Sequence, residues 1–280
     1  MLLAMIFICH LAVVPGQDQG LAGQSAQKVE KVPFDAAKWE LVWGDEFNTG
    51  TAPDPEKWTY EVGYIRNNEA QYYTKDRREN ARIENGRLVI EARRDNWDNK
   101  PITSASITTS GKKSFLYGRI EARAKVPTGR GTWPAIWTLG DNIHEVGWPK
   151  CGEIDILENV GYDPDRVHSN IHVEKYNHTK GTGKGNSIVV DKPYNDFNIY
   201  AVEWYPDRIE AYFNDTRYFI YRKESNDVDV WPFDKPQYLI LNLAIGGAWG
   251  GQRGIDEALF PHRFEIDYVR YYLPRSRASD

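Results

Sequence analysis

The acids best placed to do chemistry are Glu153, Asp155 and Glu158, within the sequence GEIDILENV at residues 152–160. In a β-strand alternate side chains point to opposite faces, so Glu153 and Asp155 share one face. Strict alternation would bury Glu158, and a buried carboxylate without a partner is costly. A β-bulge near residues 156–157 would return Glu158 to the other acids and direct the intervening apolar residues to the core. Those apolar residues are Ile154, Ile156 and Leu157.

Three carboxylates on one strand face repel one another, and the repulsion raises at least one pKa. A carboxyl group with a raised pKa acts as a general acid near neutral pH. With the bulge, Glu153 and Glu158 are about four strand positions, roughly 13 Å, apart along the backbone. Side chains that lean together over a concave sheet would bring the carboxyls to the ~5–5.5 Å found in retaining glycosidases. The alternative is an acidic strand face that only contacts solvent.

The composition restricts the possible partners. At 280 residues the chain can bury a large core as a single all-β domain. Its formal net charge is −5 with the two signs interspersed, which argues against nucleic acid and polyanionic substrates. The 10 Trp and 17 Tyr supply many rings of the kind that stack on sugars, although such rings also fill β cores.

The chain begins with an apolar run, MLLAMIFICHLAVVPG, at residues 1–16. This run is too short to span a membrane and is typical of a signal peptide, although it lacks an initial Lys or Arg. We therefore expect a secreted, periplasmic or cell-surface protein without a transmembrane segment. Residues 17–33 are polar and are expected to form a disordered leader, and residues 275–280 are expected to form a tail.

Cysteine usage predicts neither an internal disulfide nor a metal centre. Cys9 lies inside the apolar run, which leaves Cys151 alone in the mature chain. A nucleophilic thiol would require a His or a cationic neighbour. We therefore interpret Cys151 as a small space-filling residue.

Residues 34–274 are predicted to form one all-β domain, because alternating segments recur along them and no long amphipathic helix is evident. The alternating segments are residues 39–47, 81–93, 115–126, 197–222, 237–247 and 264–272. Hairpin turn signals occur at residues 84–86, 206–207 and 214–215. Many short strands with regular turns indicate a sandwich or a barrel.

Aromatic and imidazole side chains recur near the acids. Trp133 and Trp137 are four residues apart and share a strand face, and Trp148 precedes the acidic strand. Trp249 lies in GGAWGG, whose glycines suit a loop that a ligand approaches closely. Residues 166–178 place three further side chains on one face, namely His168, Asn170 and His172. A single Trp commonly packs in a core, but several near an acid triplet indicate a ligand-binding face.

These motifs together resemble glycoside hydrolase family 16. EIDILE is similar to the bulged E-x-D-x-x-E signature of that family, and the flanking sequences resemble its laminarinase branch. The flanking motifs are NNEAQYYT at 67–74, YGRIEARAKVP at 117–127, GTWPAIWTL at 131–139, GWP at 147–149 and DYVRYY at 267–272. The resemblance covers the chain from about Trp39 to Tyr272.

The resemblance implies a β-jelly-roll of two curved antiparallel sheets, with an open concave cleft along which a polysaccharide lies. It also implies retaining hydrolysis of β-1,3-glucan, with mixed-linkage β-1,3-1,4-glucan left open as a substrate. Glu153 matches the nucleophile, Glu158 the general acid/base, and Asp155 a helper beside the nucleophile. Matching substrate-binding positions are Asn68, Glu69, Trp133, Trp137, Trp148, His172 and Trp249.

The resemblance implies no cofactor for catalysis but a structural calcium site on the convex side. Its ligands match Glu46, the backbone of Gly86, and Asp267. Two carboxylates and a carbonyl suit a hard cation that prefers oxygen. The alternative for these residues is that they are exposed acids at strand ends. We expect a monomer.

One position departs from the laminarinase pattern. Laminarinases usually read SARITT where this chain reads SASITT at residues 104–109, so Ser106 stands in place of an arginine.

Two other functions remain open: hydrolysis of a marine galactan such as agar or carrageenan, and glucan binding without catalysis. The net acidic charge argues against a sulfated substrate. The presence of both Glu153 and Glu158 argues against a non-catalytic role.

Overall fold

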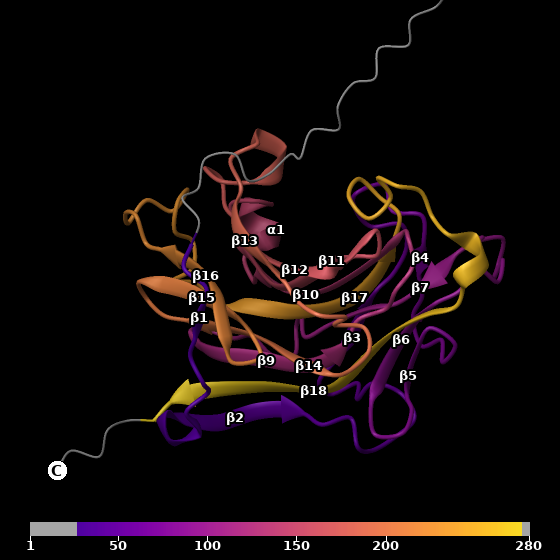
Figure 1. Cartoon of the computed structure of the whole chain (residues 1–280), viewed down its shortest axis with the longest axis horizontal. Helices are drawn as coiled ribbons and strands as arrows, with labels where there is room; N and C mark the ends of the chain where they lie inside the picture. The colour runs from indigo at the N-terminus through magenta and orange to yellow at the C-terminus, as the bar shows by residue number, and fades with distance from the viewer. Residues whose placement is uncertain (1–26, 276–280) are drawn as a thin grey trace, which may run out of the picture.

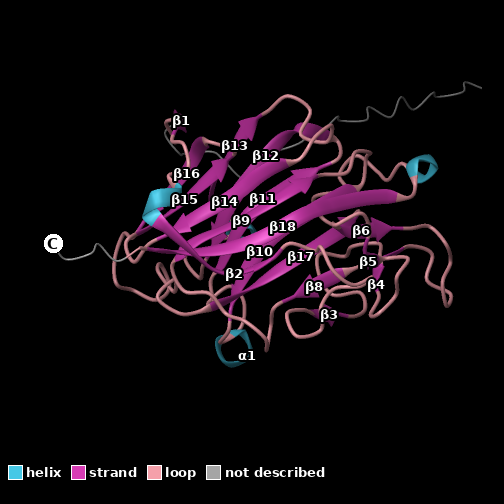
Figure 2. Cartoon of the chain, turned by 90° about the horizontal axis from the view of Figure 1, so that it is seen from below, coloured by secondary structure: helices cyan, strands magenta, loops and turns pink. Residues whose placement is uncertain are grey.

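The computed structural model describes residues 27–275, which form two large antiparallel sheets packed face to face (Figure 1, Figure 2). The predicted signal peptide at 1–16, the first part of the predicted leader and the tail beyond residue 275 lie outside the described residues. The expectation of an all-β sandwich is confirmed.

The nine-stranded sheet is built largely from the hairpins that the sequence predicts. Its strands follow the order β1 (Glu30–Lys31), β16 (Thr216–Arg222), β15 (Arg208–Phe213), β14 (Asn198–Trp204), β9 (Gly118–Lys125), β18 (His262–Pro274), β6 (Leu88–Ala92) and β5 (Ala81–Ile83), with β2 (Trp39–Asp45) also paired to β18. The predicted turns at 84–86, 206–207 and 214–215 fall between paired strands of this sheet.

The seven-stranded sheet carries the acid triplet. Its order is β13 (Lys184–Val189), β12 (Asp163–His172), β11 (Glu153–Val160), β10 (Thr132–Gly140), β17 (Gln237–Ile245), β8 (Ser106–Thr108) and β3 (Thr59–Glu61). A small parallel pair, β4 (Tyr72–Tyr73) and β7 (Thr103–Ser104), lies beside it. In Figure 1 the segment with α1 and β13 rises at one side of this sheet, and the loop after β17 rises at the other.

The hydrophobic core fills the space between the two sheets. Ile136 and Ile156 enter it from the seven-stranded sheet, and Ile120 and Val202 enter it from the nine-stranded sheet. Each of these side chains is almost completely buried, which stabilises the fold by about 1.5–3 kcal/mol per large aliphatic residue. One face of the seven-stranded sheet therefore packs on the core, and the opposite face carries a smaller apolar cluster together with polar groups.

Helices contribute little to residues 27–275, as predicted. The one α-helix in this range is α1 (Ile143–Val146), and the 3-10 helices are η1 (Ala36–Lys38), η2 (His178–Lys180) and η3 (Glu257–Leu259). None of them is long and apolar enough to cross a membrane. The positions of the side chains therefore depend on strand register and on loops.

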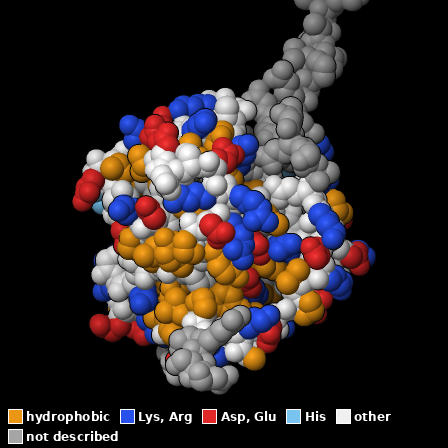
Figure 3. Space-filling model, turned by 90° about the vertical axis from the view of Figure 1, so that its left-hand side faces the viewer, with side chains coloured by type: hydrophobic (Ala, Val, Ile, Leu, Met, Phe, Trp, Pro, Cys, Tyr) orange, Lys and Arg blue, Asp and Glu red, His pale blue; other side chains and the backbone are white. Residues whose placement is uncertain are grey.

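The prediction that all of residues 17–33 are disordered is wrong for residues 27–33. Glu30 and Lys31 form β1, which pairs with the edge strand β16. The Gln27 side chain bonds the backbone of Ile220 on β16 at 2.6 and 3.0 Å. Figure 3 shows hydrophobic side chains gathered on the face that looks left in Figure 1, where β1 and β16 lie. The polar residues 27–33 are ordered because the unpaired edge of β16 offers them backbone hydrogen bonds.

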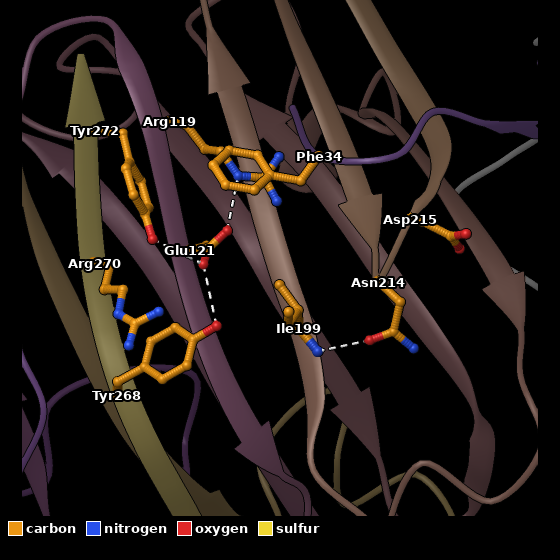
Figure 4. Close-up of a pocket in the computed structure, with 9 residues that line it drawn as sticks. All are labelled: Phe34, Arg119, Glu121, Ile199, Asn214, Asp215, Tyr268, Arg270 and Tyr272. Atoms are coloured by element: carbon orange, nitrogen blue, oxygen red, sulfur yellow. Dashed lines mark hydrogen bonds and ion pairs between the residues drawn. The ribbon is translucent and has the colours of Figure 1, made fainter. Parts of the chain in front are cut away.

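A hollow of about 330 Å³ lies on the nine-stranded sheet and is distinct from the acid triplet (Figure 4). The Glu121 carboxylate at its floor accepts hydrogen bonds from Arg119 at 2.8 Å, Tyr268 at 3.1 Å and Tyr272 at 3.3 Å. Phe34 lies over the Arg119 guanidinium, with the Phe34 ring centre 4.6 Å from Arg119 Cζ. These polar groups therefore satisfy one another.

Candidate active site

The predicted bulge in β11 is confirmed. On β10, Trp137 pairs with Asp155 and the preceding Ile136 pairs with Leu157, so Ile156 is the extra residue. The three apolar residues between the acids, Ile154, Ile156 and Leu157, are buried in the core. The bulge therefore places all three carboxylates on the opposite face, which we call the acidic face.

Gly152 sets the start of the acidic strand. Its φ of +79° lies in the left-handed region, which glycine adopts without strain. A Cβ at this position would also lie 2.8 Å from Cγ of Pro232. Only glycine therefore fits immediately before Glu153.

Strand pairing brings polar side chains opposite each acid. The pairs between β11 and β12 are Glu153–His172, Asp155–Asn170 and Glu158–His168. Directly opposed residues on neighbouring antiparallel strands have side chains on the same face. The predicted shared face of His168, Asn170 and His172 is therefore confirmed, and it is the acidic face.

Two neutral donors hold Glu158. The Trp133 indole donates to Oε1 at 3.1 Å, and the Asn170 amide donates to Oε2 at 2.8 Å. Asn170 can take this position because Gly185 lies opposite it, where a Cβ would approach Asn170 Oδ1 to 1.8 Å. Both oxygens of Glu158 are thus fixed on the acidic face.

Glu153 is held from the other side of the triplet. The Trp148 indole donates to Glu153 Oε2 at 2.7 Å, and His172 Nε2 lies 3.8 Å from Oε1. His172 Nε2 is also 3.4 Å from Asp155 Oδ2. The rings of Trp148, His172 and His178 lie 5.1–6.1 Å apart and form an aromatic wall beside Glu153.

Burial raises the pKa of all three acids. It raises the pKa of Glu153 to about 8, with the charge of Asp155 adding to the shift and His172 opposing it. Burial raises the pKa of Asp155 well above its usual range, and Glu158 adds to that shift. Burial also raises the pKa of Glu158, opposed by His172 and by the two neutral donors. Asp155 is the most buried of the three and lies between the other two acids, so the three acids titrate as a group.

A second aromatic wall stands beside Glu158. Trp249 contacts Trp133 edge to face at 5.5 Å and His168 at 4.9 Å. Burial lowers the pKa of His168 to about 4, so this imidazole is neutral near pH 7. The structure therefore brings together Trp133 and Trp249 at one side of the triplet, and Trp148 and His172 at the other.

Trp137 and Glu69 belong to a chain of hydrogen bonds on the same face. The Trp137 indole donates to Asn242 at 2.7 Å, Asn242 donates to the Tyr73 hydroxyl at 3.0 Å, and Tyr73 donates to Glu69 at 3.2 Å. Trp137 is only 7% exposed, so its ring is a covered part of the face. Asn68, the remaining predicted residue, lies exposed beside Glu69 with a positive φ of 53°.

The predicted calcium ligands lie away from the acid triplet. Because Asp45 pairs with Val269, Glu46 and Asp267 lie near one another at the pairing of β2 with β18. Glu46 accepts two bonds from Arg270 at 2.8 Å, and Asp267 accepts one from Arg123 at 2.6 Å. The oxygen ligands suit calcium by type, but the ion would compete with arginine for them.

Several residues outside the predicted site contact its members. Asn170 bonds Glu158, His178 contacts Trp148, and Arg66 lies 4.9 Å from the centre of the Trp137 ring. Strand alternation placed Asn170 on the face of His168 and His172 without giving it a role, and no local signal identifies His178 or Arg66. Cys151 is completely buried, and burial raises its pKa to about 11, which agrees with a space-filling role.

Two carboxylates on one face of a β-sandwich, each bonded by an indole and flanked by aromatic walls, are the arrangement of a polysaccharide-cleaving glycosidase. The comparison with known families agrees with this class. The chain belongs to the glycosyl hydrolases family 16, whose family model matches residues 68–270.

Similar proteins cover nearly the whole domain. The chain is 49% identical to a β-glucanase of Rhodothermus marinus over 85% of this chain and 86% of that protein. The X-ray structure of the laminarinase from Rhodothermus marinus superposes with a TM-score of 0.83 at 48% identity, covering 85% of this chain and 98% of that one. A non-specific endo-β-1,3(4)-glucanase of family 16, SCLam, gives a TM-score of 0.85 at 42% identity, covering 91% and 98%. The predicted jelly-roll and family are thereby confirmed.

Proposed function

We propose that this protein is an endo-β-1,3-glucanase that cleaves laminarin-like glucan with retention of the anomeric configuration. The observation that carries the proposal is the bulge in β11, which places Glu153 and Glu158 on one face with Asp155 between them. Support for the substrate comes from the similar laminarinase and β-glucanase. The similar endo-β-1,3(4)-glucanase supports mixed-linkage glucan as a second substrate.

In the proposed mechanism, protonated Glu158 donates its proton to the glycosidic oxygen while ionised Glu153 attacks the anomeric carbon. The bond to the leaving sugar breaks, and a glycosyl ester of Glu153 forms. Water then attacks the anomeric carbon and gives a proton to Glu158, while the bond from that carbon to Glu153 breaks and releases the Glu153 carboxylate. A proton on Asp155 removes its repulsion with Glu153, and the Trp148 indole stabilises the ionised form.

The alternatives fit the acidic face less well. A glucan-binding protein without catalysis has no need of two buried glutamates with raised pKa values. A sulfated galactan is disfavoured by the formal net charge of −5, since like charges repel. Hydrolysis of a neutral glucan is the function that this charge distribution supports best.

The first product released from laminarin is expected to be the β-anomer, within a mixture of oligosaccharides of several lengths. Two successive inversions at the anomeric carbon restore its configuration, and an inverting pair would need ~6.5–9.5 Å between carboxyls to admit water. Proton NMR of the first minutes of reaction, with size analysis of the products, measures both features. An initial α-anomer would rule out the two-step mechanism, and glucose alone would rule out internal cleavage. Lichenan, agarose and carrageenan serve as the substrate controls.

We also propose a structural calcium ion at Glu46, Gly86 and Asp267. Calcium is then expected to raise the melting temperature and EDTA to lower it, because a ligand of the folded state stabilises that state by mass action. Activity at room temperature should change little, since these residues lie away from the acid triplet. Calorimetry with calcium, magnesium and EDTA makes the measurement, and Glu46→Gln is the control that should abolish the calcium effect. Melting curves that coincide in calcium and EDTA would contradict the site.

Export through residues 1–16 and a monomeric state complete the proposal. The apolar character of residues 1–16 supports export. N-terminal sequencing of protein recovered from outside the cytoplasm tests cleavage of this segment, and light scattering tests the oligomeric state.

A further inference from the structure

A small polar unit occupies the acidic face at the position where the sequence departs from the laminarinase pattern. Arg66 pairs with one oxygen of the Glu61 carboxylate. The Ser106 hydroxyl donates to the other oxygen of Glu61 at 2.6 Å. Glu61 therefore holds Arg66 in place, and Ser106 is small enough to leave room for both.

Strand register places this unit in the same row as the proposed acid/base. Glu61 pairs with Ser106, Ser106 with Asn242, Asn242 with Ala135, and Ala135 with Glu158. Opposed residues share a face, so this row crosses the acidic face from β3 to β11. Four strand spacings of about 4.8 Å separate Glu61 from Glu158, roughly 19 Å. A polysaccharide that crosses the strands beside Glu158 would run along this row.

Arg66 reaches back from the loop after β3 toward the acids. Its Cζ lies 4.9 Å from the centre of the Trp137 ring, and Trp137 is directly opposite Asp155 on the neighbouring strand. The guanidinium therefore lies between Glu61 and the acid triplet. It is within the reach of a glucan bound for cleavage.

The Arg66 side chain is more exposed here than the indole beneath it. Trp137 is 7% exposed, whereas the Arg66 side chain is 20% exposed. Arg66 Nη1 has no hydrogen-bond partner among the described residues, so the guanidinium keeps an unused N–H donor. An unused guanidinium N–H can donate to a sugar hydroxyl, and hydrogen bonds from a charged group are stronger than those from a neutral one.

We propose that Arg66 is a substrate-binding residue that sets the affinity for β-glucan, held over Trp137 by Glu61. This inference rests on the proposed glucanase function and adds a binding position away from the bond that is cleaved. Because Ser106 and Arg66 contact the same carboxylate, an arginine at position 106 would bring its guanidinium to the same place.

Binding is measured in the Glu153→Gln background, so that oligosaccharides from laminaribiose to laminarihexaose remain intact during calorimetric titration. Arg66→Met is expected to weaken the binding of the longer oligosaccharides by about tenfold, the loss of one hydrogen bond to a charged group. The loss should appear only at lengths that reach Arg66 and stay constant beyond them. Arg208→Met is the matched control, because Arg208 also lies on an aromatic ring and pairs with a glutamate, but on the nine-stranded sheet.

The exchange of positions provides a second test. Arg66→Ser combined with Ser106→Arg is expected to recover most of the affinity that Arg66→Ser alone loses. Melting temperatures of all variants identify those that do not fold. A folded Arg66→Met that binds every oligosaccharide within twofold of its parent would overturn the proposal, as would a folded exchange variant that binds no better than Arg66→Ser.

The two levels of proposal fail in different ways. If the wild-type protein does not hydrolyse laminarin, the proposed function fails, whatever Arg66 does. If the wild type hydrolyses laminarin and Arg66→Met has an unchanged KM and chain-length dependence, the function stands and the role of Arg66 is removed.

Discussion

Replacing Glu153 by glutamine is expected to lower the turnover of laminarin by more than about a thousandfold, because loss of a nucleophile removes the covalent step. The amide keeps the shape of the carboxyl and can still accept the Trp148 indole N–H, which bonds Glu153 at 2.7 Å in the wild type. Oligosaccharide binding should therefore remain close to that of the wild type. Initial rates on laminarin and titration with laminarihexaose measure the two effects separately.

Glu145→Gln is the matched control for this substitution, since Glu145 is an exposed glutamate in α1, three residues before Trp148 in the sequence. The control should keep the activity of the wild type. A folded Glu153→Gln with turnover similar to the wild type would remove Glu153 from the mechanism. Loss of oligosaccharide binding together with turnover would instead show that Glu153 acts mainly in binding.

Replacing Glu158 by alanine is expected to slow the hydrolysis of laminarin by about 10²- to 10⁴-fold, the usual contribution of general acid–base catalysis. An aryl β-laminaribioside needs little protonation of its leaving group, so the glycosyl ester of Glu153 should still form from it. Azide attacks that ester without a general base and releases the Glu153 carboxylate. The rate with the aryl substrate should therefore rise with azide, and the product should be a β-glycosyl azide.

The product of the azide reaction identifies the two roles. NMR of the glycosyl azide gives its configuration, and Glu153→Gln is the control that should form no β-azide because it forms no ester. A folded Glu158→Ala that azide leaves unchanged on the aryl substrate would contradict the assignment of Glu158 as the acid/base. Removal of Glu158 also takes away the acceptor of Trp133 and Asn170, so a melting curve should accompany each rate.

The acidic face was predictable from the sequence because its physical requirement is local. A strand buries alternate side chains, and carboxylates cannot replace Ile154, Ile156 and Leu157 in a core without a large desolvation cost. One extra residue was the simplest way to satisfy both requirements, and β11 contains it. The family likeness supplied the roles of the acids, which strand alternation alone does not assign.

Alternation along each strand is enough to predict that Ile154, Ile156 and Leu157 face the core and that the acids share the other face. The partners of these acids depend on contacts between distant segments. Gly185 leaves room for Asn170 beside Glu158, and the loop after β3 carries Arg66 over the Trp137 ring. Residues 27–33 are likewise ordered only because the edge of β16 is free to pair with them. The physical reason is that burial follows a local period of two residues, whereas register, loop paths and strand edges are set by contacts between segments distant in the sequence.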